Sequence, residues 1–114
     1  REAFQAGPYL VRDGRPDPGL DAYREFRRAD RRTVLALDKR GRLIFLVSKE
    51  IGRGISWCEL QSFLPRSRVD GGMEVVESMN LDGGSSSQLY VKGDDQTFYL
   101  SGRIVPALLL AIAR

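Results

Sequence analysis

The sequence predicts an α+β fold in which one or two short helices accompany a mixed, largely antiparallel sheet. Two pairs of apolar runs are each joined by a short glycine-containing polar loop, which is the pattern of a β-hairpin. One segment, 56–64, has instead the apolar spacing of a helix. With 114 residues the chain can bury one small core but not two, so we expect a single domain over residues 1–114.

The N-terminal part alternates between a short apolar run and turn residues. The run around Leu10 predicts a strand, and the Pro/Gly-rich segment 16–19 predicts a loop. Residues 21–30 are polar and predict one or two helical turns, for which Asp21 is the candidate N-cap. We therefore expect one strand, a loop and a short helical segment.

The clearest predicted element is a hairpin over residues 33–47. Apolar runs at 33–37 and 43–47 flank a polar loop in which Gly41 suits a position with positive φ. Both runs are almost continuously apolar, so we expect these strands to be covered on both faces.

A short helix is predicted to begin after Ser56. Its apolar residues recur at i, i+3 and i+7 from Trp57, so Trp57 is expected to face the core. Ser56 and Glu59 have the spacing of a capping box, in which each side chain bonds the other residue's amide. Pro65 marks the expected end of the helix.

The last third of the chain predicts three further elements. Residues 73–81 alternate enough to form a strand, and residues 88–100 have the pattern of a second hairpin. The apolar stretch 103–113 is expected to be a buried last strand, although its leucines and alanines also allow a helix. Asp94 and Asp95 are expected to be turn residues of the second hairpin rather than a calcium site.

Two absences limit the chemistry that the chain can perform. It contains no histidine, which excludes Ser-His-Asp and Cys-His catalysis and histidine-based zinc sites. Its one cysteine, Cys58, allows no internal disulfide. Catalysis would then depend on carboxylates, hydroxyls, arginines, backbone amides or a bound hard cation. We predict neither a metal site nor a cofactor.

The charge is unevenly distributed. The net charge is only +3, yet eight basic residues lie between positions 24 and 42. This pattern is typical of a solvated face with a charged hairpin tip, and it also fits a patch for phosphate or an anionic polymer. Without interleaved aromatic residues we expect no nucleic acid partner. The longest apolar stretch, 104–113, is interrupted by Pro106 and too short for a membrane span.

The segment 80–87, Asn-Leu-Asp-Gly-Gly-Ser-Ser-Ser, holds more polar groups than a chain reversal needs. Glycines let a backbone approach a ligand closely and can aim successive amides at an anion. The plainer alternative is a tight turn whose serines bond locally. Its candidate ligand-binding residues are Asn80, Asp82, Gly83, Gly84, Ser85 and Ser86.

In their order along the chain, the hairpin, the helix and this loop resemble the phosphodiester glycosidase domain family. The most specific shared element is the stretch from Asn80 to Ser86, and a match to Arg32-Thr33 at a strand start supports it. The resemblance spans nearly the whole chain. It implies that a further N-terminal portion of the domain is missing from residues 1–114.

The resemblance implies a hydrolase that cleaves a sugar-1-phosphodiester or a related cell-surface glycan in an extracytoplasmic setting, periplasmic or secreted. Such chemistry uses two carboxyl groups beside the scissile bond and donors for the phosphate. It makes Asp82 and Glu59 the expected catalytic carboxylates. The expected substrate-binding residues are Arg32, Asn80, Gly83, Gly84, Ser85 and Ser86.

Other interpretations of these residues stay open. Glu59 is equally explained by the capping box, and Arg32 by one more solvated arginine. On this second interpretation, the chain is a non-catalytic module that binds an anionic glycan or a phosphate-bearing polymer. A third possibility is a subunit that pairs with a separate piece or with its own copy, so an oligomer is possible.

Overall fold

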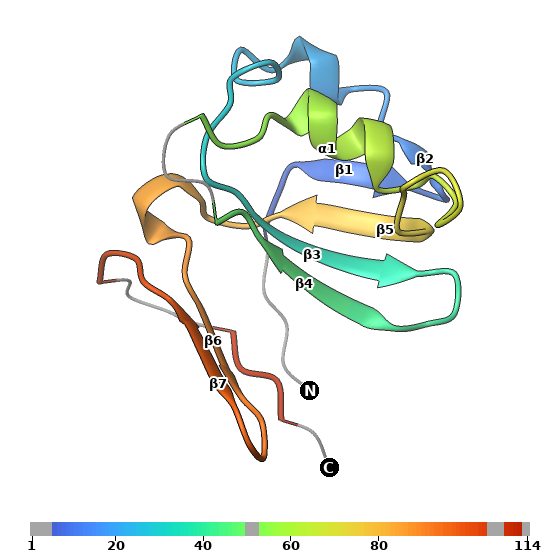
Figure 1. Ribbon diagram of the computed structural model, residues 1–114. Helices are drawn as coiled ribbons and strands as arrows, with labels where there is room; N and C mark the ends of the chain where they lie inside the picture. The colour runs from blue at the N-terminus through green and yellow to red at the C-terminus, as the bar shows by residue number, and fades with distance from the viewer. Residues whose placement is uncertain (1–5, 50–52, 105–108, 113–114) are drawn as a thin grey trace.

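The computed structural model describes residues 6–49, 53–104 and 109–112. Its main body is a five-stranded sheet of order β2-β1-β5-β3-β4 with α1 on one face, and a two-stranded sheet, β6-β7, extends from it (Figure 1). All strand pairings in these residues are antiparallel, which confirms the largely antiparallel expectation. The elements are β1 (Tyr9–Arg12), β2 (Arg15–Pro16), β3 (Thr33–Asp38), β4 (Leu43–Val47), α1 (Trp57–Phe63), β5 (Val75–Asn80), β6 (Leu89–Lys92) and β7 (Thr97–Leu100).

The core lies between α1 and the sheet face that it covers (Figure 1). The helix begins at the predicted N-cap: the Ser56 hydroxyl accepts from the Glu59 amide, and the Glu59 carboxylate accepts from the Ser56 amide. The predicted helix is thus confirmed. The buried apolar side chains come from β1, the 3₁₀ turn after β2, β3, α1 with its C-cap, and β5: Leu10, Val11, Leu20, Val34, Ala36, Trp57, Leu60, Leu64 and Val75.

The hairpin β3-β4 is confirmed, with Leu35 opposite Phe45 and Gly41 at φ +76° in the turn. Its expected burial on both faces is wrong for the residues that the structure describes. Val34 and Ala36 are buried under α1, whereas Leu37 on the opposite face is 37% exposed. The apolar character of the runs does not show this difference, because alternate residues face opposite sides of a sheet.

Two other predictions need correction. The sequence predicts one or two helical turns over residues 21–30 with Asp21 as N-cap, whereas the structure has a single 3₁₀ turn, Leu20–Ala22, whose N-cap is Gly19. The buried last strand over 103–113 is not found where the chain is described: Ile104 and residues 109–112 lie outside strands and are exposed. Positions 105–108 and 113 lie outside the described residues. The second hairpin is confirmed as β6-β7.

Candidate functional site

The loop after β5 lies beside the segment that leads into β3. Strands β3 and β5 are antiparallel with Val34 opposite Asn80, so β5 ends where β3 begins. Four hydrogen bonds join the two segments, one of them from Arg31 Nη2 to the Ser87 carbonyl at 2.7 Å. The Gly84 amide donates to the Arg31 carbonyl and the Leu81 amide to the Thr33 carbonyl, each at 2.8 Å, while the Thr33 hydroxyl lies 3.1 Å from that of Ser87. The segments around 31 and 84 are therefore fixed relative to each other.

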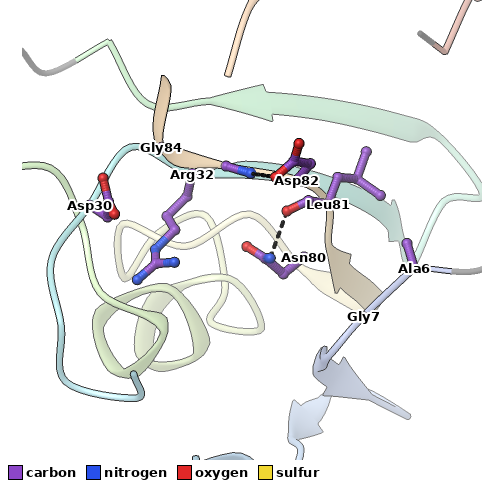
Figure 2. A pocket seen from close by; sticks show the side chains of 9 residues that line it. Ala6, Gly7, Asp30, Arg32, Asn80, Leu81, Asp82 and Gly84 are labelled. Atoms are coloured by element: carbon purple, nitrogen blue, oxygen red, sulfur yellow. Dashed lines mark hydrogen bonds between the residues drawn. The ribbon is translucent and has the colours of Figure 1, made fainter. Parts of the chain in front are cut away.

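A pocket of about 470 Å³ opens at this junction (Figure 2). Five of the predicted site residues line it, whereas Glu59, Ser85 and Ser86 are not among its lining residues. The lining consists of Ala6, Gly7, Asp30, Arg32, Asn80, Leu81, Asp82, Gly83 and Gly84.

Asp82 presents an available carboxylate to this pocket. Its side chain is exposed, and Oδ1 accepts a 2.9 Å hydrogen bond from the Gly83 amide (Figure 2). Within the described residues Oδ2 accepts no hydrogen bond and Asp82 forms no ion pair. A ligand can therefore approach one oxygen of Asp82 without breaking a contact of the fold.

The two glycines serve the loop's close approach to the neighbouring segment rather than an anion site. A Cβ on Gly83 would lie 2.8 Å from the Arg31 carbonyl oxygen, and Gly84 has φ +58°. Their amides are occupied, because Gly83 donates to Asp82 and Gly84 to Arg31. The expectation that both amides turn toward a ligand is not met by this geometry.

Arg32 lines the pocket, but its guanidinium is held largely by the chain itself. It is 7% exposed, and it donates through Nε to the Ile55 carbonyl at 3.2 Å and through Nη2 to the Arg28 carbonyl at 2.7 Å. The guanidinium carbon lies 4.9 Å from the centre of the Trp57 ring. Burial lowers the pKa of Arg32, and the nearby Asp30 charge opposes this effect. In the part of the chain that the structure describes, Nη1 is the guanidinium nitrogen with no hydrogen-bond partner.

Asn80 and Trp57 link the pocket to the helix. The Trp57 indole N–H donates to Asn80 Oδ1 at 3.1 Å, and Asn80 Nδ2 donates to the Leu81 carbonyl at 2.6 Å. Asn80 is therefore oriented from both ends. Trp57 is in the core as expected. It also fixes Asn80, and its ring packs against the Arg32 guanidinium. The apolar spacing of the helix does not reveal these two contacts.

Comparison with known proteins supplies the family. Residues 1–111 match the family model described as phosphodiester glycosidase. The chain belongs to the phosphodiester glycosidase family. No curated protein and no solved structure matches it.

Glu59 does not reach the pocket of this phosphodiester glycosidase domain. Its carboxylate accepts from the Ser56 amide and hydroxyl, each at 2.8 Å, and from Arg53 Nη2 at 2.8 Å. The bond from the Ser56 amide, followed by that from the hydroxyl, lowers the pKa of Glu59. These contacts are those of the capping box, which accounts for the residue at this spacing.

The serines of the loop mainly shape its backbone. Ser86 ends a 3₁₀ turn, Gly84–Ser86, and its amide donates to the Gly83 carbonyl at 3.1 Å. The Ser85 carbonyl accepts from the Arg103 amide at 2.8 Å, which ties the loop to the chain after β7. Neither hydroxyl belongs to the pocket lining.

Asp30 is a lining residue that the sequence pattern did not predict. Its carboxylate lies at the pocket beside Gly84, since a Cβ on Gly84 would be 3.8 Å from both carboxylate oxygens (Figure 2). The only available signal was its position two residues before Arg32, within an arginine-rich run that obscured it.

Neither a membrane-spanning helix nor a metal-binding cluster occurs among the described residues. They contain no helix long and apolar enough to cross a membrane. The same part of the chain holds no group of three or more Cys, Asp or Glu side chains placed to bind a metal ion.

Proposed function

We propose that this domain hydrolyses a sugar-1-phosphodiester or a related cell-surface glycan, with Asp82 as a catalytic carboxylate. The observation that supports this most is the position of Asp82 in a chain of the phosphodiester glycosidase family: it lines the pocket, and its Oδ2 accepts no hydrogen bond from the described residues. Cleavage of a glycosidic bond builds positive charge on the sugar ring, and a carboxylate beside C1 stabilises that charge.

The remaining pocket residues fit orientation of the substrate. Asn80 is held by Trp57 and Leu81, so its remaining N–H is available to a sugar hydroxyl at a fixed position. Arg32 is held by two carbonyls and offers Nη1 to a phosphate oxygen. Donors fixed before the substrate arrives need not be reordered during the reaction. From the family alone we also propose an extracytoplasmic site of action, periplasmic or secreted.

A second candidate is a non-catalytic module that binds an anionic glycan or a phosphate-bearing polymer. It is favoured by the contacts of Glu59, which belong to the helix cap and keep this predicted catalytic carboxylate away from the pocket. Such a module would bind the same ligands without forming product, and its binding would weaken as salt rises.

The experiment is turnover of a synthetic sugar-1-phosphodiester, read as release of free sugar and phosphomonoester. Wild-type protein is compared with Asp82→Asn, which keeps the side-chain shape, and with Asp95→Asn, which changes an exposed carboxylate in the β6-β7 turn. We expect Asp82→Asn to abolish turnover and Asp95→Asn to leave it unchanged. Salt-sensitive binding without product in the wild type would instead support the module.

A further inference from the structure

The pocket is lined by a second carboxylate, that of Asp30, which takes no part in the capping box. Among its lining residues, Asp30 and Asp82 are the two acids, and they come from opposite sides of the junction between β3 and β5 (Figure 2). Glu59 is bonded to Ser56 and Arg53 outside the lining. If the reaction uses two carboxyl groups, the chain's own geometry makes Asp30 the partner of Asp82.

The backbone of Asp30 is fixed from the helix side. Its amide donates to the Ile55 carbonyl at 3.2 Å, and the Ile55 amide donates to its carbonyl at 2.9 Å, which forms an isolated antiparallel bridge. Gly54 permits this approach, because a Cβ there would lie 2.3 Å from the carbonyl carbon of Asp30. Asp30 is therefore fixed in place before any ligand binds.

The Asp30 side chain is oriented but remains partly available. Oδ1 accepts a 2.8 Å hydrogen bond from the Arg31 amide. Oδ2 has only a 3.9 Å ion pair with Arg28 within the described residues, and the Arg28 side chain is 70% exposed. An ion pair of this length and exposure is weak. The carboxylate caps no helix and is 38% exposed, so the fold leaves it free to act on a ligand.

We propose that Asp30 is the catalytic base of the hydrolysis, a role that rests on the proposed function. Asp30 removes a proton from water as the water oxygen bonds to C1 of the sugar. The C1–O bond to phosphate breaks and its electron pair leaves with the phosphomonoester, while Asp82 stabilises the positive ring. The proton then passes from Asp30 to solvent. Phosphate is a good leaving group, so neither carboxylate has to protonate it.

The test uses the same sugar-1-phosphodiester with Asp30→Asn, Asp30→Ala and the Asp95→Asn control. Loss of a general base lowers kcat by about 10²- to 10⁴-fold. We expect that fall for both Asp30 variants with KM changed by less than about 3-fold, and unchanged values for Asp95→Asn. Added formate, a small carboxylate, is expected to restore part of the kcat of Asp30→Ala and none of that of Asp82→Asn.

The outcomes separate this inference from the proposed function. Formate rescue supports Asp30 as the base, and it also shows that the variant is folded. If both Asp30 variants keep the wild-type kcat, or if formate restores nothing to Asp30→Ala, the inference is overturned while turnover by the wild type still supports the proposed function. A wild type without turnover overturns both.

Discussion

The two ends of strands β3 and β5 use aspartate in opposite ways. Asp38 at one end is 1% exposed, and its carboxylate accepts from the amides of Arg40 and Arg42 and from the Arg42 guanidinium. Asp82 at the other end is exposed, lines a pocket and accepts one hydrogen bond from the described residues. Asp38 is the last residue of β3 and Asp82 lies two residues after the end of β5, and each precedes a glycine-containing turn. An aspartate with several hydrogen-bond partners inside the fold stabilises its turn, whereas one with few such partners is left available to a ligand.

The largest effect on stability is expected from removing Asp38. Asp38→Ala leaves the amides of Arg40 and Arg42 without their acceptor and the Arg42 guanidinium without its partner. We expect a large fall in Tm, measured by thermal unfolding. Asp82→Ala removes one local bond and is expected to leave Tm nearly unchanged. An equal fall in Tm for both variants would contradict the claim that Asp38 stabilises the fold and Asp82 does not.

The same contrast predicts how stability responds to acid. The Arg42 amide, then the other Arg42 and Arg40 donors, lower the pKa of Asp38 in the folded protein. Its contribution is therefore complete above the unfolded value of about 3.9, and it is lost as the pH falls through the lower folded value. Tm of the wild type should fall more steeply than that of Asp38→Asn below about pH 4. Parallel curves would contradict this assignment.

A matched pair of glycines compares the two turns directly. Gly83→Ala places a Cβ 2.8 Å from the Arg31 carbonyl oxygen, so the loop must shift; we expect a loss of about 2–3 kcal/mol and of most of the turnover. Gly41→Ala has open space but φ +76°, and should cost about 1–2 kcal/mol with turnover intact. Urea unfolding and the glycosidase assay measure the two quantities. Loss of turnover in Gly41→Ala would contradict the claim that the β3-β4 turn contributes to stability and not to catalysis.

The smallest change in turnover is expected at Trp57, which holds a pocket residue but does not line the pocket. Trp57→Phe keeps a ring beneath Arg32 but leaves Asn80 Oδ1 without its donor. A lost buried hydrogen bond of this kind costs about 1–3 kcal/mol. We expect KM to rise because Asn80 is no longer fixed. The fall of Tm below about pH 4, which depends on Asp38, should be unchanged. An unchanged KM would show that Asn80 does not orient the substrate.

Local patterns predicted the hairpins and the helix α1, but not the end of the chain. The β3-β4 hairpin follows from its apolar runs and Gly41, and α1 from the capping box, because each depends on residues close in sequence. The face-specific burial of β3 could not be read from its composition. It depends on which side α1 covers, and the exposure of Leu37 shows that difference.

The site was predicted only in part, for a related reason. Asn80 at the end of β5, Asp82 and the glycines lie within five residues of the sequence, which was enough to group them. Asp30 reaches the same pocket because its backbone bridges to Ile55, an approach that Gly54 permits. This contact joins distant parts of the chain, so no local sequence pattern predicts it. The internal bonding of Arg32 to Ile55 is equally non-local.

The most direct measurement is the turnover of a sugar-1-phosphodiester by wild type, Asp82→Asn and Asp38→Asn at a temperature where all three remain folded. We predict that Asp82→Asn retains substrate binding and Tm but loses product formation, while Asp38→Asn forms product at the wild-type rate. Wild-type product formation by Asp82→Asn would contradict the central claim that the free carboxylate after β5 carries the chemistry.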